Sequence, residues 1–319
     1  MIAMLRSASL LAALTAVFAC SLPLAGQGFL VTGAGYLNPA PVAAAPCQLA
    51  TLYTTVPGIS ETTSASALPL PHTLAGISAK VIGTSAAMDV PILAVYPAQL
   101  GYLPGLNTVA YNATAVTIEV PCEIPVGAGS ASLAVSGPSS PVAAVIYLSL
   151  ASDAIHVIRN GDSLTGARFS LSSATYLPPA ITHADSSLVS ATNPAKIGET
   201  VSIWAVGLGL PSSGSVATGA ANPNPPLTTQ VNVDFDFRPN AGPGMPWSGA
   251  AGPGDSHVPA ISVPAYFAPG YVGLYQINIT IPAAPVALQP CGGVYQSNVT
   301  VNIGGQASFD GAGICVARN

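Results

Sequence analysis

Two stretches decide the fold class, Val231-Asn232-Val233-Asp234-Phe235-Asp236-Phe237 and Tyr275-Gln276-Ile277-Asn278-Ile279-Thr280-Ile281. In both stretches apolar residues at the odd positions alternate strictly with polar residues at the even positions. A period of two places successive side chains on opposite faces of a β-strand, so each stretch predicts a strand with one buried and one solvated face. Such strands are typical of antiparallel sheets.

The same alternation recurs elsewhere, in Val116–Val120, Ala131–Val135 and Val299–Ile303, and no long stretch beyond the N-terminal segment has a helical period. The 32 glycines and 31 prolines lie largely between these runs, where turns are expected. The pattern therefore predicts an all-β protein.

Charged residues are scarce, because 7 Lys+Arg and 12 Asp+Glu make up only 6% of the 319 residues. The chain has no basic patch for phosphates, which argues against a nucleic-acid partner. It also lacks the charged outer faces of a helical bundle or coiled coil. With 50% hydrophobic residues, it is not a disordered polar chain.

An internal repeat predicts two similar β-sandwich domains. Val116–Pro121 and Ile277–Pro282 are each followed by a cysteine and by a strand that ends in glycine. Leu52–Gly58 and Ile203–Gly209 open the two copies alike. The expected segments are an N-terminal signal at 1–26, an exposed leader at 27–46, domains at 47–152 and 193–319, a connector at 153–192, and a Gly/Pro loop at 238–259 within the second domain.

The N-terminus predicts export. Arg6 precedes the apolar run Leu10–Ala19, which is the arrangement of a secretory signal. Cleavage after Ala19 would leave Cys20 as the first residue of a lipoprotein, whereas cleavage near Gly26 would release a soluble chain. A retained membrane anchor is disfavoured, because the run is shorter than the roughly 20 residues that span a bilayer. We expect the protein to be secreted or at the cell surface, with no transmembrane segment after signal removal.

The cysteines agree with export. Without Cys20 an even number remains, as expected for disulfides in an oxidising compartment. Four cysteines allow three pairings. If each domain folds alone, neighbours in sequence pair, which gives Cys47–Cys122 and Cys291–Cys315. Their wide spacing does not fit a zinc site.

No catalytic motif is present in the sequence. The four histidines have no metal-ligand spacing, and Gly-x-Ser-x-Gly and phosphate-binding loops are missing. His183 and Asp185 are the first pair to test for a Ser-His-Asp arrangement, although a polar connector explains them more simply. We therefore predict no catalytic residue and no cofactor.

Two binding sites are hypotheses. Asp234 and Asp236, with Asn232 on the same strand face and Asp255 or Asp310 nearby, would offer oxygen ligands to calcium. Alternatively, these carboxylates keep an outward sheet face soluble.

The second hypothesis is an aromatic platform for sugar or peptide, formed by Trp247 in the Gly/Pro loop with Tyr266 and Tyr271. Alternatively, Tyr271 and Tyr275 pack in the sandwich and Trp247 caps the loop.

A family resemblance covers most of the chain after the signal. Asn193–Gly209, Ala268–Asn278 and Thr182–Val189 resemble hallmarks of the C-terminal domain family of Solibacter and other soil Acidobacteria. Tyr96–Gln99 and Val120–Gly127 resemble a more divergent copy. The resemblance implies two tandem immunoglobulin-like β-sandwiches in an exported protein. It implies no activity, and the loop 238–259 and the cysteines depart from the family pattern.

Together these observations predict an exported, noncatalytic β-sandwich protein that acts in adhesion, ligand binding or structure, with an extracellular polysaccharide or another surface protein as partner. The alternative is a secreted hydrolase whose site has no recognised motif.

Overall fold

The computed structural model describes residues 29–31, 42–54, 59–83, 86–100, 111–127, 130–138, 140–158, 179–238, 256–288, 298–303 and 311–317. All regular secondary structure in these ranges is β-strand, and none of the described residues is helical. The predicted all-β fold class is therefore confirmed. The signal segment 1–26 lies outside the described residues.

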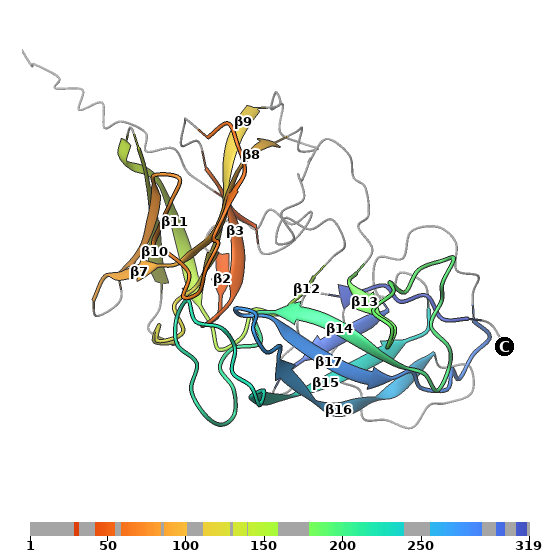
Figure 1. The fold of residues 1–319 in the computed structure, drawn as a ribbon. Helices are drawn as coiled ribbons and strands as arrows, with labels where there is room; N and C mark the ends of the chain where they lie inside the picture. Colours follow the sequence, from red (N-terminus) through yellow and green to blue (C-terminus); the bar gives the residue numbers. More distant parts are fainter. Residues whose placement is uncertain are drawn as a thin grey trace, which may run out of the picture.

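The N-terminal half forms two sheets (Figure 1). The first has the order β1(Phe29–Val31), β3(Leu49–Thr54), β9(Tyr111–Glu119), β8(Ile92–Leu100), β4(Thr63–Ser64). The second has the order β2(Val42–Ala44), β11(Ser140–Leu150), β10(Ser130–Gly137), β6(Ile77–Ile82), β5(Thr73–Leu74), and β7(Met88–Val90) also pairs with β6.

These two sheets face each other across one hydrophobic core. Leu52 and Val116 from the first sheet and Leu133 and Leu148 from the second belong to the same buried cluster, and all four are fully buried. The N-terminal half is therefore a β-sandwich.

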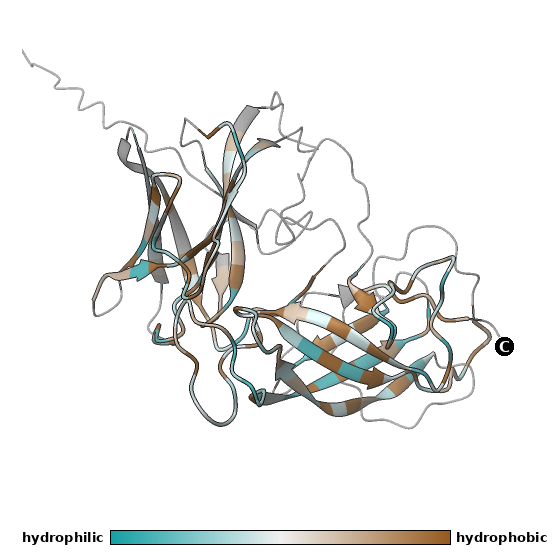
Figure 2. Ribbon diagram, in the orientation of Figure 1, coloured by the Kyte–Doolittle hydropathy of each residue, from teal (hydrophilic) through white to brown (hydrophobic). Residues whose placement is uncertain are grey.

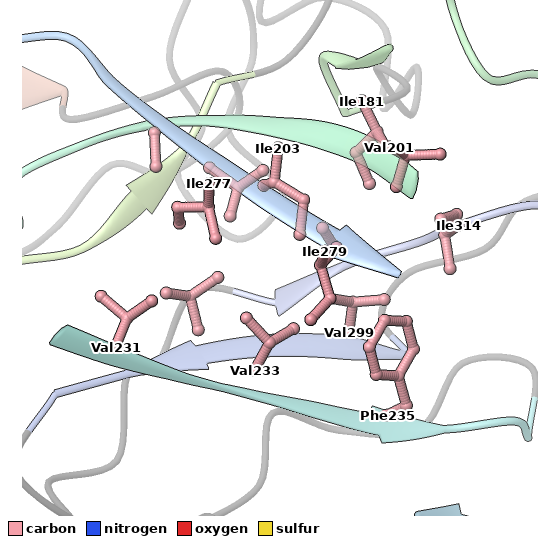
Figure 3. Packing of buried hydrophobic residues seen from close by; sticks show 14 of the residues in the cluster. Ile181, Val201, Ile203, Val231, Val233, Phe235, Ile277, Ile279, Val299 and Ile314 are labelled. Atoms are coloured by element: carbon pink, nitrogen blue, oxygen red, sulfur yellow. The ribbon is translucent and has the colours of Figure 1, made fainter. Parts of the chain in front are cut away.

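The C-terminal half is one curled sheet. Its order is β12(His156–Val157), β14(Thr200–Val206), β17(Tyr275–Thr280), β16(His257–Phe267), β15(Thr228–Asp236), β18(Val299–Asn302), β19(Gly311–Ala312), and β13(Ile181–Thr182) pairs with the edge of β14. The long strand β16 pairs with β17 near its end and with β15 along most of its length. It thus connects β17 and β14 to β15 and β18, whose buried side chains face each other across the core (Figure 3).

The residues that alternate in the sequence form the core of this half. Ile203, Ile277 and Val233 are fully buried and point into one cluster, which Phe235 closes at one end (Figure 3). The strands β14 and β17 show the matching alternation of hydrophobic and hydrophilic residues along their length (Figure 2). Period-two patterning therefore places the core as expected.

The expectation of an exposed leader at 27–46 is wrong for its last three residues, 44–46, which are buried. Phe29–Val31 pairs with β3, and Val42–Ala44 pairs in parallel with β11. Ala44 and Ala45 are fully buried. The strand Val42–Ala44 is too short to show an alternation in the sequence, but the small side chain of Ala44 fits against the sandwich.

The connector expected at 153–192 also contributes to the sheets. Its described residues include β12 and β13, which both pair with β14. Val157 and Ile181 lie in the core of the C-terminal half. The C-terminal half therefore begins well before residue 193.

The two halves meet at a tight joint. Leu49 and Leu70 of the N-terminal half pack in one cluster with Ile158, Val206 and Val272 of the C-terminal half; we call this group the joint cluster. Two glycines of the C-terminal half lie close to backbone atoms of other segments there. A Cβ on Gly207 would lie 2.1 Å from the Ala154 carbonyl oxygen, and one on Gly273 would lie 2.4 Å from that of Cys47. Close backbone approach thus explains why glycine stands at positions 207 and 273.

Candidate functional site

The loop expected at 238–259 connects strands β15 and β16. Asp236 is the last residue of β15 and pairs with His257, the first residue of β16. The residues 257–259 are therefore strand, and the loop is shorter than expected at this end. Residues 239–255, which include Trp247, lie outside the described residues. The two ends of the loop lie side by side on a paired hairpin.

Asp236 holds both ends of the loop. From one end, Arg238 Nε donates to Asp236 Oδ1 and Oδ2 at 3.0 Å each, and Arg238 Nη2 donates to Oδ2 at 2.5 Å. From the other end, Ser256 Oγ donates to Oδ1 at 2.5 Å, and His257 Nε2 lies 3.3 Å from Oδ2. A planar guanidinium that donates to both carboxylate oxygens is a strong, directional pair. We call these four residues the loop clamp.

Electrostatics favours the charged form of Asp236. Burial raises its pKa, but the hydrogen bonds donated by Arg238 and Ser256 outweigh burial and lower the pKa to about 2. Asp236 is therefore ionised throughout the neutral range, and the loop clamp persists there.

The structure buries the residues of the calcium hypothesis. Asp234 is 3% exposed and Asp236 is 5% exposed, so the alternative interpretation of an outward, solvated face is wrong. The register between β15 and β16 shifts between Val233 and Phe235, and such a bulge breaks the simple alternation of faces. Asp255 and Asp310 lie outside the described residues. Calcium binding stays a prediction.

The aromatic residues of the platform hypothesis lie in different places. Tyr266 is half-buried on the outer face of β16. Tyr271 is 60% exposed in the turn between β16 and β17, whereas Tyr275 is buried in the core. The alternative that Tyr271 packs in the sandwich is thus wrong, and the part concerning Tyr275 is right.

The cross-strand register adds an aromatic residue that the sequence analysis missed. Tyr266 lies opposite Gln276, and Gln276 lies opposite Trp204. Since directly paired residues share a sheet face, these three side chains form a row across β16, β17 and β14. Trp204 alternates with the buried Ile203 and Ala205, and this alternation was the available signal. Its indole Nε1 donates to Thr182 Oγ1 at 3.1 Å.

Uncharged polar side chains continue this face beyond the row. Ser202 Oγ donates to Asn278 Oδ1 at 2.8 Å, and Gln276 Nε2 donates to the same oxygen at 2.9 Å. Thr200 and Thr280 hydroxyls are 3.0 Å apart. Side chains that hydrogen-bond one another in this way are held in place before any ligand arrives. We call the row and this polar group the outer face.

His183 and Asp185 do not converge on a serine. His183 Nδ1 lies 2.5 Å from Glu199 Oε1, and His183 Nε2 lies 3.2 Å from the Asn193 carbonyl oxygen. Asp185 instead accepts hydrogen bonds from the amide and the hydroxyl of Ser187. The hydrogen bond with Glu199 raises the pKa of His183, against the opposing effect of burial. The two ring nitrogens of His183 therefore tie the connector, in which His183 lies, to Glu199 and Asn193.

Cys47 and Cys122 form a disulfide that links residues 75 apart, as the pairing by sequence neighbours expects. Cys315 is also disulfide-bonded, and its expected partner Cys291 lies outside the described residues. Glu119 lies close to both sulfurs of the first disulfide. This buried carboxyl group is a second feature that the sequence analysis missed, because no local pattern distinguishes it from a strand-end residue.

Comparisons with known proteins found no match to the chain among protein-family models, curated proteins or solved structures. Within the described part of the chain, no helix is long and apolar enough to cross a membrane.

Proposed function

We propose that the protein is an exported, noncatalytic module that acts by contact, and that its second half carries the binding surface. The observation that carries this proposal is the loop clamp. It fixes both ends of a long Gly/Pro-rich loop to a paired hairpin. A variable loop on a rigid scaffold is a common way to build a recognition surface.

The disulfide supports export. Disulfides form and persist in oxidising compartments, and Cys47–Cys122 closes a large part of the N-terminal half. Together with Arg6 and the apolar run Leu10–Ala19, it favours a secreted or cell-surface location. Both proposed routes, a released chain and a lipoprotein through Cys20, place the disulfide in such a compartment.

We further propose that the two halves are tandem immunoglobulin-like domains. Matching strand pairings support this proposal: β3 and β9 pair antiparallel, and so do β14 and β17, which carry the corresponding stretches of the sequence repeat. Likewise β10 pairs antiparallel with β6, as β18 does with β15. Each half also contains a parallel pairing, which is β2 with β11 in the N-terminal half and Ala195 with Val316 in the C-terminal half. This order agrees with the ABED and CFG sheets of immunoglobulin-like sandwiches.

The outer face supports an uncharged, polyhydroxylated ligand such as a neutral polysaccharide. Tyr266 and Trp204 are two strands apart in one row, about 10 Å at the usual strand spacing, and the half-buried Trp204 ends the row where it packs against the joint cluster. Between them Gln276 and its polar neighbours offer amide and hydroxyl groups. Aromatic rings and uncharged hydrogen-bonding groups suit sugars, which present both apolar faces and hydroxyls.

The proposal is tested by measuring binding of the purified secreted protein to immobilised polysaccharides and cell-wall fractions. A first variant replaces residues 239–255 with Asn-Gly, which leaves a five-residue loop of residues 237–238, Asn, Gly and residue 256 between the paired Asp236 and His257. A second is Tyr266→Ala. Ile82→Ala, on an exposed position of the N-terminal half, is the control.

We expect the loop replacement and Tyr266→Ala to weaken binding at least tenfold while the control binds as the wild type does. If neither variant changes binding by the folded protein, the proposed surface is wrong. If the protein instead cleaves esters, peptides or glycans and His183→Ala abolishes cleavage, the noncatalytic proposal fails.

A further inference from the structure

Two glutamates of the N-terminal half receive hydrogen bonds from one turn of the C-terminal half. Glu119 Oε2 accepts from the Gly219 amide at 2.5 Å. Glu123 accepts from the Thr218 amide at 3.3 Å and also from the Thr218 hydroxyl. These residues are about 100 positions apart in the sequence, so the contacts exist only because the two halves are docked.

The turn is seated closely against the N-terminal half. Thr218 Oγ1 also accepts from the Cys122 amide at 2.8 Å, and the Gly219 carbonyl accepts from the Leu70 amide at 2.7 Å. A Cβ on Gly219 would lie 3.3 Å from the Leu70 nitrogen, so a side chain there would crowd the contact. In Figure 1 the segment after β14 runs beneath the N-terminal sheets.

The Glu119 carboxyl group is enclosed by this arrangement. Its residue is 2% exposed, and the carboxyl group lies beside the Cys47–Cys122 disulfide, which carries no charge. Among the described residues, Glu123 is the titratable side chain whose charge acts on it, and no cation faces it. The 217–219 turn contacts the two glutamates through backbone amides and the Thr218 hydroxyl.

We propose that Glu119 is a proton-controlled latch between the two halves, closed while its carboxyl group is protonated and released when that group ionises. Once ionised, Glu119 would be a buried anion next to the Glu123 carboxylate. Buried charges require solvation or an opposite charge. Here solvation is available only if water enters, and water enters only if the 217–219 turn moves away.

The pKa values support this direction. Burial raises the pKa of Glu119 to about 8, with a further increase from the Glu123 charge and an opposing decrease from the Gly219 hydrogen bond. For Glu123, burial is outweighed by the hydrogen bonds from Thr218, and its pKa is lowered. Because the folded pKa of Glu119 lies above its ordinary 4.5, its contribution to the closed joint is complete at low pH and is lost as the pH rises through about 8.

Trp204 provides a probe of the joint. It packs against the joint cluster, and the chain has only one other tryptophan, Trp247. In a Trp247→Phe background, the emission of Trp204 and the radius of gyration from small-angle scattering are measured from pH 5 to 9.5. Far-ultraviolet circular dichroism checks that both halves stay folded.

We expect a red shift of the emission and an increase in the radius of gyration, both with a midpoint near pH 8. Glu119→Gln keeps an oxygen for the Gly219 amide but cannot ionise, and we expect it to stay closed over the whole range. Glu123→Gln removes the neighbouring charge and lowers the midpoint.

The proposal is overturned if the parent protein shows no transition up to pH 9.5. It is also overturned if Glu119→Gln opens with the same midpoint, since another group then controls the joint. If Glu119→Gln does not fold, the Glu123→Gln variant tests the proposal instead. An unchanged midpoint in Glu123→Gln contradicts the latch. None of these outcomes depends on polysaccharide binding.

Discussion

Replacing Asp236 with asparagine tests whether the loop clamp stabilises the C-terminal half. The pKa of Asp236 is about 2 in the folded protein, compared with 3.8 for the unperturbed group. One pKa unit corresponds to about 1.4 kcal/mol, so the charged carboxylate contributes about 2 kcal/mol at neutral pH. The Asp236 side chain is 6% exposed but that of Arg238 is 64% exposed, so solvent screens part of this contribution and about 2 kcal/mol is its upper bound.

The pH dependence follows from the direction of the shift. Because the folded pKa is lower than the unfolded one, the contribution is present above pH 3.8 and is lost as the pH falls through about 2. Asp236→Asn should therefore lower the free energy of unfolding at pH 7 by an amount up to about 2 kcal/mol. The difference between the two proteins should shrink as the pH approaches 2.

Urea unfolding at pH 7, 5, 3 and 2 measures this difference. With a slope of about 2 kcal/mol per molar urea, the midpoint at pH 7 should fall by up to about 1 M. Asp89→Asn is the matched control, since Asp89 pairs with Lys80 at 3.1 Å but both side chains are more than half exposed. Such a surface pair contributes under about 1 kcal/mol. An equal loss at pH 7 and pH 2, or no loss at pH 7, would refute the reasoning.

Two further predictions concern the joint and its surroundings. Replacing both Cys47 and Cys122 with serine should lower the free energy of unfolding by about 4.5 kcal/mol, which is the chain-entropy value for a loop of 75 residues. Denaturant unfolding of the purified variant measures this loss. A change below about 1 kcal/mol would contradict the prediction. Gly207→Ala should cost at least about 2 kcal/mol, because the new Cβ meets the Ala154 carbonyl oxygen and the backbone has a φ of +76°. Gly198→Ala is its control, because φ is +81° there but no atom lies within 4 Å of the new Cβ. Thermal unfolding should show a clearly smaller loss of stability for this control. Equal losses in the two variants would mean that the joint is not tightly packed.

The candidate site was only partly accessible to sequence reasoning. The sequence located the loop between β15 and β16 and singled out Tyr266 and Asp236. It did not assign Asp236 its role, because Arg238, Ser256 and His257 come together only when the hairpin pairs. It also missed Trp204, whose partner in the row lies on β17, more than 70 residues away.

The alternation of residues by itself determined which side chains of β17 and which apolar side chains of β15 enter the core, since a strand's two faces depend on positions along the chain. The internal repeat likewise marked strands that pair antiparallel, β3 with β9 and β14 with β17. Tertiary structure alone decided that Ala44 is buried and that Glu119 is enclosed by a turn 100 residues away. The physical reason is that burial depends on what docks against a residue, and for Glu119 the partner comes from the other half of the molecule.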